Sequence, residues 1–188
     1  MIDKVEKLQC SGCSACANAC PVAAIKMQSD DEGFQYPKIN YDSCIKCNLC
    51  ERICPVLAGQ KRYAERLAEP KAKAAWTRNP EVRFMSTSGG LFTELARAFL
   101  KEDGFVAGAI YNDKFQVEHC LTDNTAGIEK LRQSKYVQSN KKDIFKQVSA
   151  KLKQDKRVLF VGAPCEVGGL YNFLGKDYSQ LITIDYIC

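Results

Sequence analysis

Short apolar runs alternate with helically spaced apolar residues in the second half of this chain. Apolar side chains three and four residues apart predict helices over residues 90–101, 125–132, 142–154 and 165–174. Runs rich in β-branched and aromatic residues predict strands over residues 73–77, 105–111, 115–122, 158–161 and 181–187. Asn112 and Asp113 separate two of these strands, which predicts a hairpin.

The order of the last three elements restricts the fold. Strand 158–161, helix 165–174 and apolar strand 181–187 predict two parallel strands joined by a right-handed crossover. Together with the hairpin, this order predicts a mixed sheet with flanking helices, in an α+β or α/β fold.

The first half has shorter elements. Short helices are expected over residues 14–20 and 46–54. Strands over residues 25–29 and 34–39 are expected to form a hairpin around a glycine-containing turn. From residue 56 to about residue 71 the periodicity weakens and charges accumulate, which indicates a linker.

A chain of 188 residues has room for two domains. We place a small domain at residues 1–57, a linker at residues 58–72 and a larger domain at residues 73–188. None of the segments approaches the ~18 consecutive apolar residues of a membrane span, and the first residues lack the apolar core of a signal peptide. We therefore expect a cytoplasmic protein without direct membrane insertion.

Eight of the eleven cysteines form an internal repeat. Each half of it reads Cys-x-x-Cys-x-x-Cys-x-x-x-Cys-Pro, and the second half follows the first by 34 residues. The repeat comprises Cys10, Cys13, Cys16 and Cys20, then Cys44, Cys47, Cys50 and Cys54. Three closely spaced thiolates can surround one face of an iron-sulfur cluster, whereas the fourth points out of that loop.

In the bacterial two-cluster pattern the fourth cysteine binds the other cluster. We therefore expect two 4Fe-4S centres with exchanged fourth ligands. The two expected sets are Cys10, Cys13, Cys16 with Cys54, and Cys44, Cys47, Cys50 with Cys20. Zinc is an alternative, although zinc sites usually take pairs of cysteines from two separate loops. Disulfides are a weaker alternative, because they need an oxidising compartment and eleven is an odd number.

Residues 1–57 resemble a bacterial dicluster ferredoxin module. Pro21 and Pro55 occupy the positions that this family has after its fourth cysteines. The resemblance implies a compact cage, with small and apolar residues between the cysteines that keep water from the clusters.

A basic run and three loops of the second half could carry chemistry. Residues 130–157 contain ten Lys and Arg against two Asp, which is typical either of a solvated helix face or of a site for phosphates or an acidic partner. Nucleic acid is not expected, because no aromatic stacking platform accompanies these charges. The loop at residues 86–90 precedes a helix and could bind phosphate or merely cap that helix. The loops at residues 134–139 and 162–165 carry polar side chains and a possible sheet-edge site.

In this order, the loops resemble the beta subunit of the coenzyme F(420)-reducing hydrogenase and dehydrogenase family, over residues 73–188. The matching segments are residues 86–90, 134–139, 161–170 and 182–188. The resemblance implies a bound FAD. Its implied contacts are Ser86, Thr87, Ser88, Gly89, Gly90, Lys135, Tyr136 and Ser139. Glu166 stands where members of this family often have glutamine.

The two resemblances together imply an iron-sulfur flavoprotein oxidoreductase that relays electrons between FAD and 4Fe-4S clusters. Its partners would be a redox protein or subunit and a small-molecule donor of hydride or electrons. The rival hypothesis is a ferredoxin-type carrier without enzyme activity, whose second domain docks a redox or polysaccharide-pathway partner. His119, the only histidine, is expected to be a core or partly exposed residue rather than a base, and Cys120 an ordinary residue.

Cys165 and Cys188 are the remaining cysteines that we single out. Cys165 begins a predicted helix and Cys188 follows an apolar strand, so both could lie at one sheet edge. The family resemblance implies a third 4Fe-4S cluster there. Because two ligands are not four, we expect these thiols to be half of a site that only a longer chain completes.

Overall fold

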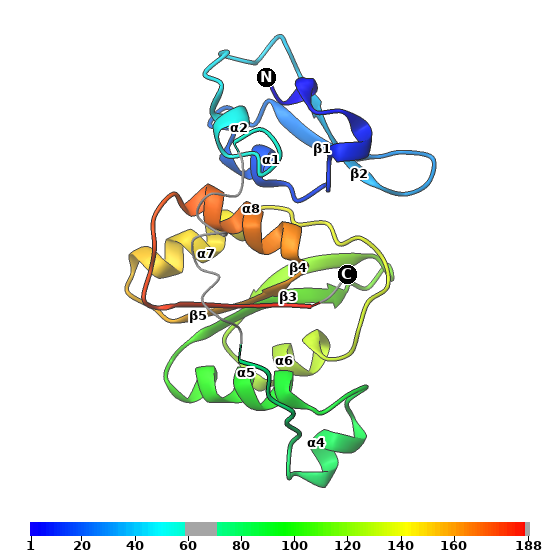
Figure 1. Cartoon of the computed structure of the whole chain (residues 1–188), viewed down its shortest axis with the longest axis vertical. Coiled ribbons are helices and arrows are strands. Elements are labelled where there is room, and N and C mark those ends of the chain that lie inside the picture. Colours follow the sequence, from blue (N-terminus) through cyan, green and yellow to red (C-terminus); the bar gives the residue numbers. More distant parts are fainter. Residues whose placement is uncertain (59–70, 187–188) are drawn as a thin grey trace.

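A computed structural model of the chain describes residues 1–58 and 71–186. It consists of an N-terminal part, residues 1–58, stacked on a second part, residues 71–186 (Figure 1). Most of the linker that we predicted at residues 58–72 lies outside the described residues. The two parts differ in architecture, as their sequence patterns predicted.

The N-terminal part is built from short elements around one hairpin. Strands β1 (Ile25–Ser29) and β2 (Gln35–Ile39) pair in antiparallel fashion, as predicted. Their turn is stabilised by the Asp30 carboxylate, which accepts hydrogen bonds from the backbone N–H groups of Glu32 and Phe34. The remaining elements are two short 3-10 helices, η1 (Ile2–Lys4) and η2 (Lys7–Gln9), and two short α-helices, α1 (Ala15–Ala19) and α2 (Leu49–Arg52).

A four-stranded mixed sheet forms the centre of the second part. Strands β3 (Phe105–Tyr111) and β4 (Val117–Thr122) form the predicted hairpin. Strand β5 (Val158–Gly162) pairs in parallel with β3, and β6 (Leu181–Asp185) pairs in parallel with β5. The order is therefore β4-β3-β5-β6, and the predicted strand-helix-strand crossover is present.

Helices cover both faces of this sheet (Figure 1). Helices α5 (Leu91–Lys101) and α6 (Thr125–Leu131) pack on one face, where Val106 and Leu159 are buried. Helices α7 (Ile144–Lys153) and α8 (Pro164–Leu174) pack on the other face, where Ala107 and Phe160 are buried. Neighbouring strand residues thus point to opposite faces and fill two separate cores. Within the described ranges, no helix is both long and apolar enough to cross a membrane.

The N-terminal part shares a hydrophobic core with α7 and α8. Ala15 of α1 and Ile53 are buried in the same cluster as Phe145, Val167 and Leu170. Helix α1 contacts both α7 and α8. Burying a side chain such as Ile53 stabilises a fold by about 1.5–3 kcal/mol. The shared core therefore stabilises the contact between the two parts.

Two local predictions for residues 73–84 need correction. The strand predicted over residues 73–77 is wrong: this segment forms no strand, and its Thr77 N–H bonds to the carbonyl of Gly89 rather than to a sheet strand. The sequence pattern also missed helix α4 (Pro80–Phe84). The Asn79 side chain caps α4 by accepting hydrogen bonds from Glu81 and Val82, with proline at the first helical position.

Candidate metal centres

The two halves of the cysteine repeat have the same backbone conformation. Gly12 and Ser14 both have φ of 64°, and the residues 34 positions later, Lys46 and Asn48, have φ of 55° and 56°. Ser14 precedes α1 and Asn48 precedes α2. A left-handed residue on each side of the second cysteine bends the loop so that three cysteines face one side, and a short helix then leads to the fourth. The 34-residue repeat is therefore a repeat of structure as well as of residue types.

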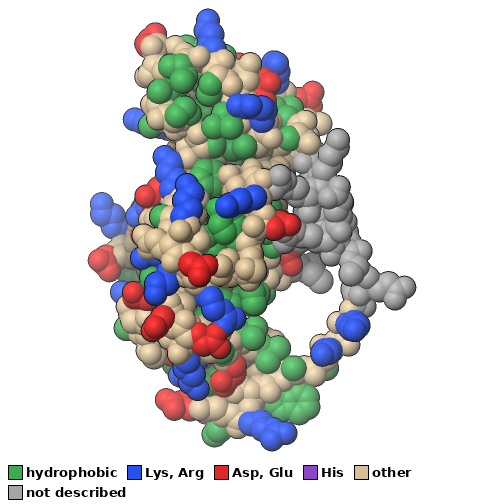
Figure 2. All heavy atoms as spheres, turned by 90° about the vertical axis from the view of Figure 1, so that its left-hand side faces the viewer, with side chains coloured by type: hydrophobic (Ala, Val, Ile, Leu, Met, Phe, Trp, Pro, Cys, Tyr) green, Lys and Arg blue, Asp and Glu red, His purple; other side chains and the backbone are tan. Residues whose placement is uncertain are grey.

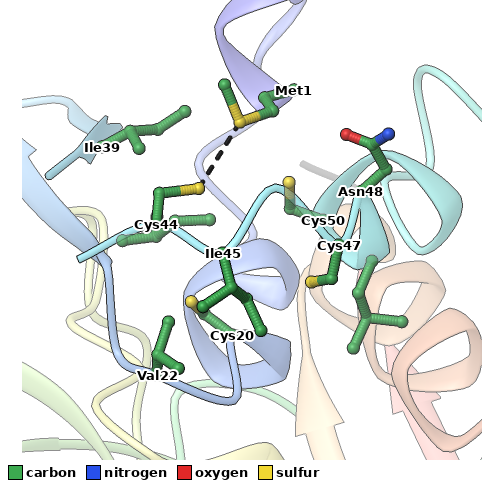
Figure 3. Close-up of a pocket in the computed structure, with 11 residues that line it drawn as sticks. Met1, Cys20, Val22, Ile39, Cys44, Ile45, Cys47, Asn48 and Cys50 are labelled. Carbon is green, nitrogen blue, oxygen red and sulfur yellow. Dashed lines mark hydrogen bonds between the residues drawn. The ribbon is translucent and has the colours of Figure 1, made fainter. Parts of the chain in front are cut away.

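One cavity, which we call the outer cavity, is lined by Cys20, Cys44, Cys47 and Cys50 (Figure 3). It encloses about 360 Å³, counting the space open to solvent. The hairpin closes one side through Ile25 and Ile39. Three of its cysteines come from the second half of the repeat, and Cys20 comes from the end of α1 in the first half.

The other cavity, the inner cavity, is lined by Cys10, Cys13, Cys16 and Cys54. It encloses about 340 Å³, again with the space open to solvent. Met27 and Pro37, from the same face of the hairpin, line it together with Ile2. Each half of the repeat thus contributes three cysteines to one cavity and its fourth cysteine to the other. This is the grouping that the spacing predicted, although the role of the eight thiols as ligands stays a prediction.

The inner cavity is the more buried of the two. Cys16 is 6% and Cys54 is 8% exposed, whereas Cys47 of the outer cavity is exposed. Burial raises the pKa of the Cys13 thiol to about 11, and it also raises the pKa of Cys10 and Cys16. Because burial raises their pKa, these three thiols stay protonated until a bound metal displaces the protons.

The donor chemistry fits iron-sulfur clusters. Cysteine thiolate is the usual ligand of 4Fe-4S clusters, which take four cysteines each. Four thiols surround each cavity, and apolar side chains fill the gaps between them. Among residues 1–58 and 71–186, no three His, Cys, Asp or Glu side chains are grouped so that they could hold a single metal ion.

The loop predicted to bind flavin phosphate lies between α4 and α5. Thr87 and Ser88 are exposed, and Gly90 precedes α5 without a side-chain cap. The glycines have a structural reason: a Cβ on Gly89 would lie 2.7 Å from the Ala75 carbonyl oxygen, and one on Gly90 would lie 2.7 Å from the Thr77 methyl group. The Ser86 hydroxyl donates to the Val82 carbonyl at 2.6 Å.

The second predicted flavin loop spreads its side chains over different surroundings. The Lys135 ammonium donates to backbone carbonyls at the end of α6, including those of Leu131 (3.0 Å) and Arg132 (2.6 Å). Tyr136 is 92% exposed. Gln138, which we did not single out, accepts a hydrogen bond from Gln35 N–H at 2.6 Å and donates to the Ser11 carbonyl at 3.2 Å. This loop therefore contacts the N-terminal part.

Ser139 belongs to a buried polar cluster that the sequence did not reveal. Its hydroxyl lies 2.8 Å from His119 Nδ1, and its carbonyl accepts a hydrogen bond from the Lys141 ammonium at 3.0 Å. Glu166 completes the cluster, 2.5 Å from Lys141 Nζ and 3.5 Å from His119 Nε2. The structure thus brings together Ser139, one predicted flavin contact, with Glu166 and with His119, which is buried, the first of the two alternatives expected for it. Lys141 was part of the basic run, and the sequence carries no signal for its burial.

The predicted half-site at Cys165 and Cys188 is only partly described. Cys165 lies in the first turn of α8, near Cys13. Burial is the main cause of the raised pKa of the Cys13 thiol, and the nearby Cys165 raises it further. Cys188 lies outside the described residues. The shared site therefore stays a prediction. Cys120 is half-buried, and burial raises the pKa of its thiol.

Comparison with known proteins covers the cysteine repeat. Residues 9–58 match the model of a 4Fe-4S dicluster domain. No curated protein matches the chain. The N-terminal part is thus a ferredoxin-type domain, which supports a role in electron transfer. These comparisons do not support the resemblance of residues 73–188 to the coenzyme F(420) family, nor the FAD that it implied.

Proposed function

We propose that the chain is an electron-transfer protein that holds one 4Fe-4S cluster in each cysteine cavity. The observation that carries this proposal is the exchange of the fourth cysteine, which gives each cavity four thiols from both halves of the repeat. Bound clusters of this kind supply one-electron transfer without a change of ligands. Each set of four cysteines would hold one cluster, and neither half of the repeat could complete its set alone.

The residues around the cavities would keep the clusters apart from bulk water. Ile2, Met27 and Ala15 line the inner cavity, and Ile25, Ile39 and Leu49 line the outer one. An apolar surrounding disfavours the more highly charged state of a cluster, and so affects its potential. Backbone N–H groups can act in the opposite direction: Ala24 N–H lies 3.2 Å from Cys20 Sγ and donates to that sulfur.

The positions of the two cavities support an order in which electrons would pass through them. A Cβ on Gly169 of α8 would lie 3.1 Å from Cys13 Sγ, so the inner cavity adjoins the second part of the chain. The outer cavity has the exposed Cys47, with Ile45 and Val22 exposed beside it. Figure 2 shows hydrophobic side chains among polar ones on the surface of the N-terminal part. An external redox protein would therefore exchange electrons at the outer cavity, and the second part would do so through the inner one.

A flavoprotein oxidoreductase with FAD in the second part is the second candidate. One feature favours it: α5 begins after Gly89 and Gly90 without a side-chain cap, beside the exposed Thr87 and Ser88. The other implied contacts do not fit, because Lys135 caps α6 and Ser139 is buried against His119. As a set, the residues implied to contact FAD therefore do not fit it. The rival without a flavin, a carrier whose second part docks a protein partner, needs none of these contacts.

Analysis of one anaerobic preparation tests the proposal. We expect about eight iron and eight acid-labile sulfide per chain, since two 4Fe-4S clusters contain that number. A Cys120→Ser variant is the control, because Cys120 lines neither cavity, and it should keep both clusters. Zinc without sulfide would overturn the proposal. Addition of FAD to the same preparation separates the two candidates: uptake at micromolar concentration favours the flavoprotein, and failure to bind favours the docking rival.

A further inference from the structure

A lysine and a glutamate form a buried ion pair at the start of α8. Lys141 is 1% exposed and Glu166 is 5% exposed, and their Nζ and Oε1 atoms are 2.5 Å apart. Burial opposes ionisation of Glu166, but the charges of Lys141 and His119 outweigh it and lower the pKa of this carboxyl. The second carboxylate oxygen accepts a hydrogen bond from Ala163 N–H at 2.9 Å. Each member of the pair thus has a further hydrogen-bond partner, Ser139 for Lys141 and Ala163 for Glu166, which offsets part of the cost of burying the pair.

The pair joins two segments that both touch the inner cavity. Lys141 lies in the segment 138–142, where Gln138 bonds to Ser11 and Gln35, and where the Lys142 carbonyl accepts from the Asn18 amide at 2.9 Å. Ser11 lies between Cys10 and Cys13 and lines the inner cavity.

Glu166 lies one helical turn before Gly169 of α8. Gly169 meets Cys13 so closely that an added Cβ would lie 3.1 Å from the sulfur. The ion pair therefore connects the two pieces of the second part that enclose the inner cysteine loop from outside.

We propose that the Lys141–Glu166 pair positions segment 138–142 and α8 against the inner cysteine loop, and thereby sets the reduction potential of the inner cluster. The proposal rests on the proposed function, since it assumes a 4Fe-4S cluster in the inner cavity. Exposure to water and hydrogen bonds to the sulfurs set the potential of such a cluster. A loosened wall would admit water, favour the more highly charged reduced state and raise the potential. The outer cluster serves as the internal reference.

Variants at the pair separate positioning from a direct effect of charge. Lys141→Met leaves a negative charge and Glu166→Gln leaves a positive one, so a direct charge effect would shift the inner potential in opposite directions. Positioning predicts an upward shift in both variants. Gln138→Ala removes two hydrogen bonds from the other side of the segment without leaving a charge, and should give a smaller upward shift. Lys146→Met, at an exposed lysine of α7, is the matched control and should give none.

Potentiometric titration followed by electron paramagnetic resonance measures both clusters in each variant. We expect the inner potential to rise in Lys141→Met, Glu166→Gln and Gln138→Ala, while the outer potential stays constant. Shifts of opposite sign in the two charge variants, equal shifts of both clusters, or no shift would each overturn the inference. If the charge variants fail to fold, Gln138→Ala and the double variant Lys141→Met/Glu166→Gln decide alone. A failure of the proposed function itself looks different, because the unaltered protein would then lack iron and sulfide.

Discussion

The inner and outer cavities arise from one repeated motif but have different surroundings. Both have three cysteines on a loop with two left-handed residues and a fourth cysteine from the other half. Beside the inner cavity, α8 meets Cys13 at Gly169, and Gln138 of segment 138–142 bonds to the Ser11 carbonyl. The outer cavity keeps Cys47 exposed, and its Cys44 sulfur lies 3.5 Å from the Met1 thioether. Residue spacing thus determines which thiols meet, whereas distant parts of the chain determine how far each set is from water.

The difference suggests a division of work between the two sites. A cluster with an exposed ligand would approach a separate protein, while one in the inner cavity would exchange electrons with the outer cluster and with the second part. If the division holds, the two cavities are independent sites, and their surroundings affect them differently.

Exchange of the fourth cysteine predicts the largest effect. Cys20→Ala should remove the outer cluster and leave the inner one, although Cys20 is a sequence neighbour of Cys16. Cys54→Ala should do the reverse. Each variant should hold about four iron atoms instead of about eight. Iron analysis and electron paramagnetic resonance show which cluster is lost. If each variant instead lost the cluster held by the three cysteines of its own half of the repeat, the exchange would be refuted.

Two adjacent glycines in α8 test the contact with the inner cavity. Gly169→Ala places a Cβ 3.1 Å from Cys13 Sγ and 3.3 Å from its Cβ, and such overpacking costs about 1–3 kcal/mol of unfolding free energy. Gly168→Ala meets nothing within 4 Å and should instead stabilise α8, by about 0.5–1 kcal/mol. Denaturant unfolding of both variants measures the difference. Equal effects at the two positions would mean that α8 does not press on the inner loop.

The repeat, the hairpin and the crossover could be predicted because each leaves a local pattern. Cysteine spacing, alternating strands and the Asn112–Asp113 turn depend on near neighbours in sequence. Residues 73–77 look like a strand, but their partner is a loop rather than a strand, and no local pattern tells the two apart.

The candidate site shows the same limit. The burial of Lys141 depends on Glu166, which is distant in sequence, so a basic run gave no sign of it. Lys135 and Ser139 are separated because their loop runs from the end of α6, which Lys135 contacts, to the buried polar cluster that contains Ser139. A motif of six residues cannot show that its side chains point into different surroundings.

Exposure predicts which cluster is lost first. An iron chelator or oxygen reaches the outer cavity past the exposed Cys47 and Ile45, whereas Cys16 and Cys54 are buried. The outer signal should therefore disappear faster than the inner one during exposure to either reagent. Ile45→Ser should widen that difference, and Phe115→Ser, at an even more exposed side chain of the distant hairpin, should not. Simultaneous loss of both signals would contradict the difference in access.

The smallest effect concerns His119, the only histidine, which lies in the buried polar cluster with Ser139 and Glu166. Its ring stacks on Phe160 with centroids 5.6 Å apart, and burial lowers its pKa below the ordinary value of 6.5 more than the nearby Glu166 raises it. The unfolded chain therefore binds the proton first as pH falls. Stability should be constant above about pH 6.5 and decline from there toward the folded pKa, by no more than about 1.4 kcal/mol per pH unit. Nuclear magnetic resonance of the single imidazole gives the midpoint without assignment, and His119→Gln should remove the decline. A midpoint at or above 6.5 would show that burial does not dominate the surroundings of this imidazole.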